Sequence, residues 1–413
     1  MPPPGSLLAR LLGSSSLRSA AGFGIGGIGY AVATIVLAKV LPTNSFGVVT
    51  LVLALSQFGL TLGPFGLEIV ANRHRPRANR GFALLVFSLA ALTGVFIAVV
   101  AGVYYHLSTS MVYLVFAIVV GTATNRVGAA LFQGEQRLPL AMTLLQVHNF
   151  VLLAVALWAT AMIHTTDVFV VSVVTLGYLL SAVGGWWLAL RTVNRGRVDV
   201  DLVLALKEGA AAMGIGIAVQ LLMQFERLAI PKLGSLEMLS TYAVLAATVG
   251  SPFRMLQMGT SFSLLPRLRS AQTAAAARSV LFRESALSLG VALLAAAAIW
   301  LASPLIFATV LGGKYPIDNG LIVASIVIGL ARMWEGFSTT VVSALGSARG
   351  MALISAFAWA CLAVAAGGAI FGSRYGLLGI LWGVGLAWLL LATGGTYLAA
   401  ASFRARFSGQ STR

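Results

Sequence analysis

The stretch LAKVLPTNSFGVVTLVLA, residues 37–54, contains the end of one apolar segment, a short polar turn and the start of a second apolar segment. A similar phrase, AIPKLGSLEMLSTYAVLA, occupies residues 229–246 once one gap is allowed. Both turns are flanked by apolar runs of about 20 residues, the length that a helix needs to cross a bilayer. The repeated hairpin therefore predicts a membrane protein built from two related halves.

The composition of the whole chain agrees with this interpretation. Hydrophobic residues make up 59% of the 413 residues and charged residues only 9%, whereas a soluble domain carries about 25% charged residues. These values exclude an ordinary soluble domain and predict an all-α polytopic membrane protein with about twelve transmembrane helices. The apolar segments of membrane length are residues 18–41, 46–71, 81–105, 110–133, 139–163, 167–190, 209–231, 238–264, 284–311, 318–345, 351–371 and 376–400.

The longest polar interruption, residues 191–208, divides these segments into two sets of six. It predicts a cytoplasmic linker between an N-terminal lobe, 18–190, and a C-terminal lobe, 209–400, related by a pseudo-two-fold axis along the membrane normal. Residues 1–17 are expected to form an amphipathic interfacial segment, and residues 401–413 a basic cytoplasmic tail.

The positive charges indicate how the chain is oriented. Nineteen of the 27 Lys and Arg lie at the two termini or in alternate connections, and only four lie in the connections on the opposite side. Because cytoplasmic loops collect Lys and Arg, both termini are predicted to be cytoplasmic. The net charge of +16 is then a topology signal that also predicts contact with anionic membrane lipids, and it gives no reason to expect nucleic-acid binding.

Motifs for catalysis or cofactor binding are missing from the sequence. Cys361 is the only cysteine and the four histidines are scattered, so neither a disulfide nor a metal site is expected. GFGIGGIG, residues 22–29, matches the dinucleotide pattern G-x-G-x-x-G, but it lies inside an apolar span, where glycines let helices pack closely or bend. The sequence therefore predicts no enzyme activity, no catalytic residue and no cofactor.

Six charged residues fall inside predicted spans. Each costs roughly 2.5–3.5 kcal/mol at the centre of a membrane helix, so such residues are expected to face the bundle interior or a water-filled cavity. The six are Arg126, Glu226, Arg227, Arg254, Arg332 and Glu335. Arginine outnumbers acid among them, which favours an anionic substrate because guanidinium groups bind phosphate in bidentate fashion.

The depth of these side chains suggests their roles. Arg254 and Arg332 lie deepest and are predicted to bind the substrate, with Arg126 and Arg227 as further contacts. Glu226 is a candidate for binding a coupling ion. However, Glu226 and Arg227 lie within roughly 7 Å of the outer surface, so an interfacial position for this pair remains open.

The remaining polar candidates lie on the same two predicted helices. Glu335 follows Arg332 by three residues, hence on the same helix face, and is the second candidate for a coupling ion. Gln220 and Gln224 are four residues apart and are expected to line one side, where they would bond a neighbouring helix or a sugar hydroxyl.

Three phrases resemble the polysaccharide or oligosaccharide (O-antigen-type) flippase family, part of the multidrug, oligosaccharidyl-lipid and polysaccharide exporter superfamily. They are VLAKVLPTNSFGVVTLVLALSQFGLTLGPFGLEIVANR (36–73), FERLAIPKLGSLEMLSTYAVL (225–245) and IFATVLGGKYPIDNGLIVASIVIGL (306–330). Members of that family often carry Asp-Arg or Asp-Lys where this chain has Glu226 and Arg227.

The resemblance implies a flippase of the bacterial or archaeal inner membrane that serves cell-surface polysaccharide biosynthesis. Its substrate would be a polyprenyl-diphosphate-linked oligosaccharide, moved to the outer leaflet by alternating access through a cationic central cavity. Glycosyltransferases or a polymerase of the same pathway would be partners. Moving two negative charges outward across 100 mV releases about 4.6 kcal/mol, so the membrane potential alone could drive export.

Two alternatives remain open at this point. The first is a cation-coupled exporter of small molecules or drugs from the same superfamily, which would use Glu226 or Glu335 for coupling. The second is a membrane scaffold without transport activity, against which the charges inside the spans argue. Drug sensitivity measured beside surface glycan would separate the exporter from the flippase.

Overall fold

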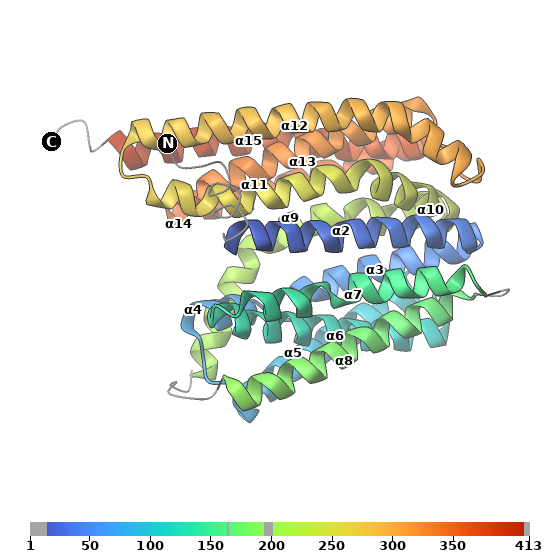
Figure 1. The fold of residues 1–413 in the computed structure, drawn as a ribbon, viewed down its shortest axis with the longest axis horizontal. Coiled ribbons are helices and arrows are strands. Elements are labelled where there is room, and N and C mark those ends of the chain that lie inside the picture. Colours follow the sequence, from blue (N-terminus) through green and yellow to red (C-terminus); the bar gives the residue numbers. More distant parts are fainter. Residues whose placement is uncertain (1–14, 163–164, 194–200, 409–413) are drawn as a thin grey trace, which may run out of the picture. The chain divides into compact units, whose positions relative to one another are not determined.

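The computed structural model describes residues 15–162, 165–193 and 201–408, and these residues contain helices but no β-strand (Figure 1). The helical elements are α2 (Ser15–Val40), α3 (Thr43–Leu62), α4 (Leu67–His74), α5 (Arg80–Val103), α6 (Thr109–Gly134), α7 (Leu138–Ala159), α8 (Asp167–Thr192), α9 (Leu202–Leu233), α10 (Leu236–Leu245), η1 (Ala246–Gly250), α11 (Ser251–Ser270), α12 (Ala274–Thr309), α13 (Asn319–Leu345), α14 (Ala348–Gly372), η2 (Ser373–Tyr375) and α15 (Gly376–Phe407).

Each of the twelve predicted spans coincides with one helix or with consecutive helical segments. Within the described residues, eight helices are long and apolar enough to cross a membrane, and the bent pair Leu202–Ala211 and Gly216–Leu233 adds a ninth. One of the eight, Arg349–Phe407, joins α14 and α15. The prediction of an all-helical polytopic membrane fold is confirmed.

Besides the bend in α9, two of the predicted spans are interrupted. The second is broken between α3 and α4, where Phe65 and Gly66 adopt positive φ angles of 53° and 76°. Two consecutive left-handed residues end a right-handed helix, and hydropathy does not report backbone conformation. The eighth is interrupted by a π-helical segment, η1, between α10 and α11.

Both chain ends differ in extent from the predicted segments. Of the predicted interfacial segment 1–17, residues 1–14 lie outside the described residues, and α2 begins at Ser15. At the other end, α15 continues to Phe407, well into the predicted tail. The last residues of that tail, 409–413, lie outside the described residues.

The predicted linker, residues 191–208, is helical at both ends. α8 continues to Thr192, and α9 begins at Leu202 behind the N-cap Asp201, whose carboxylate accepts a hydrogen bond from the Val203 amide. Residues 194–200 lie outside the described residues.

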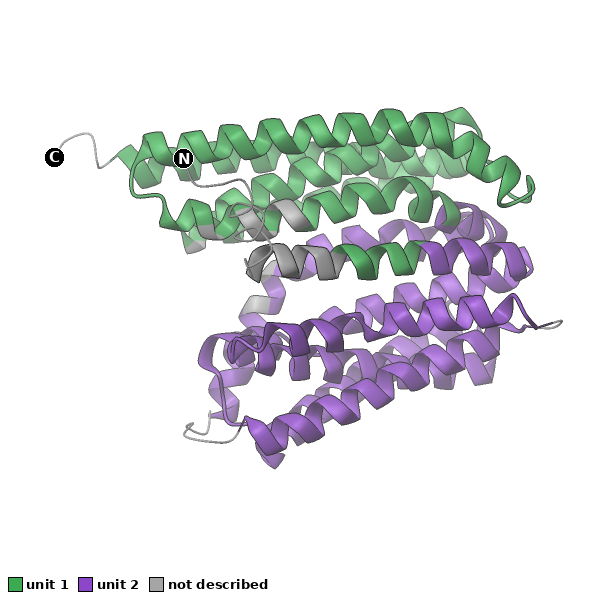
Figure 2. Cartoon of the chain, in the orientation of Figure 1, with its two compact units in different colours: residues 1–31, 244–413 green, residues 32–243 purple. Residues whose placement is uncertain are grey.

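Contacts divide the chain into two compact units, coloured separately in Figure 2. Unit 1 comprises residues 1–31 and 244–413, and unit 2 comprises residues 32–243. The division falls inside α2 and inside α10, and within unit 2 α9 packs against α3 and α4. The division of the spans at 191–208 into lobes of six remains a prediction from the sequence.

Polar residues begin many of the helices. The side chain of Asn79 accepts from the amide of Phe82, and that of Asp318 from the amide of Leu321, both at 2.8 Å. Such caps satisfy amides that have no partner in the first turn. Further side-chain caps are Ser108, Thr166, Asp201, Thr273 and Ser347.

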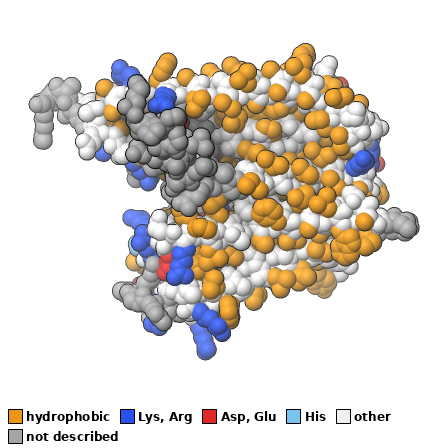
Figure 3. Space-filling model, in the orientation of Figure 1, with side chains coloured by type: hydrophobic (Ala, Val, Ile, Leu, Met, Phe, Trp, Pro, Cys, Tyr) orange, Lys and Arg blue, Asp and Glu red, His pale blue; other side chains and the backbone are white. Residues whose placement is uncertain are grey.

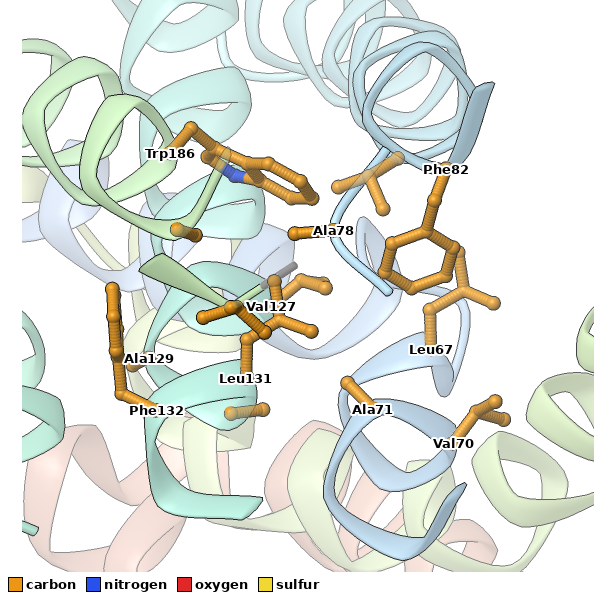
Figure 4. Packing of buried hydrophobic residues seen from close by; sticks show 14 of the residues in the cluster. Leu67, Val70, Ala71, Ala78, Phe82, Val127, Ala129, Leu131, Phe132 and Trp186 are labelled. Carbon is orange, nitrogen blue, oxygen red and sulfur yellow. The ribbon is translucent and has the colours of Figure 1, made fainter. Parts of the chain in front are cut away.

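One core cluster of unit 2 joins α4, α5, α6 and α8 (Figure 4). Leu67, Phe82 and Leu131 are almost completely buried in it. The Trp186 ring packs against Phe82 with 6.2 Å between centroids, and its Nε1 donates to the Thr124 carbonyl oxygen at 2.9 Å. A buried indole with a satisfied N–H fixes α8 against α6.

A polar link joins the middle helices of unit 2. The buried side chain of Asn125 on α6 donates from Nδ2 to the Leu144 carbonyl of α7 at 2.6 Å, and its Oδ1 accepts from the Ser181 hydroxyl of α8 at 3.0 Å. One amide therefore bonds two neighbouring helices, as is common inside membrane bundles.

Replacing Asn125 with alanine should lower stability by about 1–2 kcal/mol, because the Leu144 carbonyl and the Ser181 hydroxyl both lose a partner. Unfolding of the purified protein in mixed micelles measures the loss. The control is Asn149→Ala, since the Asn149 amide donates to Gln146 of the same helix. Equal losses in the two variants would contradict the proposed role of the link between helices.

In unit 1, glycines bring α14 and α15 into backbone contact. A Cβ atom at Gly368 would lie 2.7 Å from the Gly383 carbonyl oxygen, and one at Gly372 would overlap the Gly379 carbonyl. Any larger residue would push the two helices apart. This arrangement matches the small-residue interfaces of membrane helices.

The surface of both units suits a lipid environment. Figure 3 shows hydrophobic side chains over the visible face of each unit, with Lys and Arg gathered mainly toward one end of the helices. Leu92 of α5 is 70% exposed and Leu294 of α12 is 74% exposed. Apolar surface of this extent is expected where helices face hydrocarbon.

Candidate functional site

Glu335 lies near the middle of α13 and is 3% exposed. The hydroxyl of Thr339, one turn later, donates to its Oε1 at 2.7 Å. In the part of the chain that the structure describes, no Lys or Arg forms an ion pair with Glu335. A buried carboxylate without a cation is costly to maintain, so this group is suited to taking up a proton or a small cation.

Arg332 lies three residues before Glu335 on α13 and is half-buried. Its guanidinium lies over the Trp388 ring of α15, 4.8 Å from the ring centroid. Although the sequence placed both charged groups on one helix face, no ion pair joins them among the described residues. The indole stabilises the Arg332 charge by a cation–π interaction.

α11 packs against α13 beside Glu335. A Cβ atom at Gly336 would lie 2.6 Å from Cγ of Gln257, and one at Gly329 would lie 2.8 Å from Cγ of Phe253. The Gln257 side chain thus reaches the residue next to Glu335. Sequence reasoning missed Gln257, although its spacing of four from Phe253 places both on one helix face.

Arg254, the deepest predicted substrate contact, is exposed on α11. It follows directly after Phe253, whose ring is buried against α13. Successive helix residues point about 100° apart, so Arg254 projects away from the α13 contact while Phe253 fills it. Exposure shows that Arg254 is not part of the buried Glu335 surroundings.

The π-helical segment η1 lies just before α11. Pro252 has no backbone N–H to donate, and nearby hydroxyl groups bond two carbonyls of this region. Ser251 Oγ donates to the Ala247 carbonyl at 2.7 Å, and Thr248 Oγ1 donates to the Val244 carbonyl at 2.8 Å. π-Helical turns occur often at functional sites, and this one directly precedes α11, the helix that carries Gln257.

The polar candidate residues of α9 belong to unit 2, and two of them are in contact. Arg227 Nη1 donates to Gln224 Oε1 at 3.3 Å. Gln224 is 4% exposed and Glu226 1% exposed, whereas Gln220 is exposed. The two glutamines, which were expected to line one side of the helix, differ in burial, because α9 is covered by its neighbours at Gln224 and uncovered one turn earlier.

Arg126 of α6 is half-buried near Glu68 of α4. The positive charge of Arg126 interacts electrostatically with the Glu68 carboxyl group. α4 is too short to span a membrane, so this pair of charges lies beside the break between α3 and α4. Arg126 therefore acts electrostatically on a neighbouring carboxyl group.

A second polar cluster in unit 2 holds the end of α9. The Tyr105 hydroxyl donates to the Leu228 carbonyl at 2.8 Å, and Lys232 Nζ lies 4.5 Å from the centroid of the Tyr104 ring. Pro231 lies in the same turn and has no N–H to donate. Burial, and secondarily Tyr104, raise the pKa of Tyr105, so its hydroxyl remains a donor.

The turns of the two repeated hairpins contact each other within unit 2. The Ser240 hydroxyl donates to the Thr43 carbonyl oxygen. Reciprocally, a Cβ atom at Gly47 would overlap the Leu236 carbonyl oxygen. In the repeated hairpins, Thr43 is the counterpart of Leu236 and Gly47 is the counterpart of Ser240, since both pairs have the same sequence separation. Each hairpin therefore offers the same backbone carbonyl to the small residue of the other hairpin, and the contact is symmetric.

The candidate residues divide between the units. Arg254, Arg332 and Glu335 lie in unit 1, and Arg126, Gln220, Gln224, Glu226 and Arg227 lie in unit 2. Within the described residues, no group of three or more His, Cys, Asp or Glu side chains could hold a metal ion.

No protein-family model matches the sequence, and no curated protein matches it by sequence. Solved structures, in contrast, match almost the entire chain. An inward-facing multidrug-resistance MATE family transporter of the MOP superfamily is 16% identical, with a TM-score of 0.64 over 92% of this chain and 95% of that one.

Two further structures support the same fold. MATE in a bent conformation is 16% identical, with a TM-score of 0.58 over 98% of this chain and 99% of that chain. An outward-facing MATE family transporter is 14% identical, with a TM-score of 0.57 over 96% and 98%. The chain is a polytopic helical membrane protein with the fold of MATE transporters, and the expected arrangement of about twelve helices in two lobes is consistent with that fold.

Proposed function

We propose that this protein is a membrane transporter that exports its substrate by alternating access. The likeness of its fold to transporters described as inward-facing and outward-facing supports this proposal. The solved neighbours include multidrug-resistance transporters, which favours a small-molecule exporter as the particular activity.

The observation that carries the proposal is the buried Glu335. Its carboxyl group has the Thr339 hydroxyl as donor and lies in the middle of a membrane helix. Ionisable groups at such depth are expensive and are usually retained for ion or proton pathways. We assign Glu335 the coupling role: it binds a proton or cation in one conformation and releases it in the other. Glu226, also buried, is the second candidate for this role.

The surroundings of the arginines also favour the small-molecule exporter. Arg332 lies over Trp388, Arg227 donates to Gln224, and Arg126 lies near Glu68. A binding surface for a diphosphate needs guanidinium groups whose donors point to the substrate. Interactions within the protein already engage these guanidinium groups in part, which leaves less of each group for binding a phosphate.

The second candidate function is the flipping of a polyprenyl-diphosphate-linked oligosaccharide, in line with the resemblance of the sequence phrases. The exposed position of Arg254 favours it, because an exposed guanidinium can approach a phosphate without first leaving a buried site. In this case Arg254 and Arg332 would bind the head group, and glycosyltransferases or a polymerase would supply or use the glycan.

Cells that lack the protein distinguish the two activities. The exporter predicts greater drug sensitivity with unchanged surface glycan, and wild-type protein restores resistance. The flippase predicts loss of surface glycan, restored by the wild type but not by Arg254→Ala or Arg332→Ala variants that still insert in the membrane. If neither phenotype appears and vesicles containing the purified protein transport neither class, the transport proposal is wrong.

The orientation belongs to the same proposal. We place the protein in the inner membrane of a bacterium or archaeon with both termini in the cytoplasm. Exposed arginines at helix ends, such as Arg269 and Arg404, would then contact anionic lipids of the cytoplasmic leaflet. Protease accessibility in oriented membrane vesicles tests this placement.

A further inference from the structure

A histidine lies in the middle of helix α7 of unit 2, far along the sequence from both glutamates discussed above. His148 is the eleventh residue of the 22-residue helix α7. Its imidazole stacks on the Tyr178 ring of α8, with 4.7 Å between the ring centroids and 16° between the planes. Tyr178 is 1% exposed, and His148 is half-buried.

The helices around the stack are held close together. Leu144 and Val151 of α7 lie against Gly185 and Gly177 of α8, where added Cβ atoms would lie 3.2 Å and 2.9 Å from them. These two contacts bracket His148 along α7. The Asn125 amide bonds the Leu144 carbonyl and the Ser181 hydroxyl at the same interface.

The polar groups on α8 continue beyond Tyr178. Thr175 lies three residues earlier, on the same helix face. Its hydroxyl is buried and has no hydrogen-bond partner among the described residues. The interface of α7 and α8 therefore contains an imidazole, a phenol and a hydroxyl group at membrane depth.

The helices that pack most closely on α7 carry few charged residues. α7 packs against α6 and α8. The charged residues of these helices are Arg126, which lies near Glu68, and Asp167 and Arg191, which lie at the two ends of α8. Tyr113, near the start of α6, is exposed, and the Tyr178 ring stacks on His148.

We propose that His148 is a proton-binding site of unit 2, separate from Glu335 in unit 1. The imidazole takes a proton at the ring nitrogen that carries none and becomes an imidazolium, which the face of the Tyr178 ring stabilises as it would any cation. The neutral ring stacks on the same phenol. Both protonation states of the His148 imidazole therefore fit the same site. Binding of the proton adds one positive charge at the interface of α7 and α8.

Proton binding itself does not depend on transport, whereas its use in transport rests on the proposed function. If the protein exports by exchange with protons, His148 supplies a second site whose occupancy follows pH. A variant whose residue 148 cannot take up a proton would then lose part of the pH dependence of export while retaining the fold.

The direct test is nuclear magnetic resonance of the imidazole in lipid nanodiscs. His74, His106 and His164 are replaced by Gln, so that isotope-labelled His148 is the only imidazole. We expect one titration step between about pH 5 and pH 9. Tyr178→Leu should move its midpoint by at least about 0.5 pH unit, and Tyr178→Phe, which keeps the ring face, should move it less.

The second measurement is the pH profile of export in vesicles. His148→Gln should remove one pH-dependent step, and His148→Phe, which keeps a stacked ring, should remove the same step. The control His106→Asn alters an exposed histidine outside the helices and should leave the profile unchanged. Ring signals that stay constant over the pH range would overturn the proton site. Titration without any export would leave the site standing and reject the proposed transport.

Discussion

Replacing Glu335 with glutamine is expected to reduce proton- or cation-driven transport to the level of empty vesicles. Glutamine has nearly the same shape and can still accept a hydrogen bond from the Thr339 hydroxyl, but it cannot ionise. The variant should fold normally or be somewhat more stable, because a buried group that no longer ionises has a lower desolvation cost. Substrate uptake driven by an imposed ion gradient in proteoliposomes is the measurement.

Two companion variants make this result specific. Glu284→Gln removes a carboxylate that pairs with Arg267 elsewhere in unit 1, and it should retain gradient-driven transport. Thr339→Val removes the hydroxyl donor and should weaken transport only partly. Wild-type rates in Glu335→Gln would show that coupling occurs elsewhere, and Glu226→Gln would then be the next variant to measure.

Replacing Gly368 with alanine is expected to destabilise the packing of α14 on α15 by about 3 kcal/mol, near the upper end for an overpacked core. The new methyl group would lie 2.7 Å from the Gly383 carbonyl oxygen and 2.9 Å from its Cα atom. Because both contacts are with backbone, no side-chain rotation relieves them. Thermal unfolding in detergent, followed by the fraction of monodisperse protein, measures the loss.

The adjacent residue provides a matched control. A Cβ atom at Gly367 would meet nothing within 4 Å. Gly367→Ala should leave stability unchanged or raise it by up to about 1 kcal/mol, since alanine favours a helix over glycine. Similar destabilisation in both variants would contradict the assignment of the loss to the backbone contact of Gly368 with α15, because helix propensity alone favours alanine at both positions.

The sequence predicted the helices well because their length and apolar character are local properties. The caps at the starts of α5 and α13 were not predicted: the structure shows that the side chains of Asn79 and Asp318 accept from the amides of Phe82 and Leu321. The two interruptions were missed for a physical reason. The positive φ at Gly66 and the π-helical turn at Ala246–Gly250 depend on backbone geometry, which hydropathy does not record.

The candidate site was predictable in its residue types and less so in its contacts. Charges within apolar spans identified Arg332 and Glu335, and both are at least half-buried. The partner of Arg332, Trp388, lies on a different helix, and a cation–π contact leaves no spacing pattern in the sequence. Periodicity also could not show that Arg254 is exposed, because exposure depends on which neighbouring helix covers that face.

The reciprocal contact between the two hairpin turns has a consequence for the origin of the chain. A two-fold symmetric contact is one that a polypeptide can make with an identical copy of itself. A half-length ancestor with a glycine or serine at the position of Gly47 and Ser240 could therefore have joined two molecules here before a gene duplication fused them. Because both contacts end on backbone carbonyl oxygens, small residues at Gly47 and Ser240 would be required whatever side chains stand at Thr43 and Leu236.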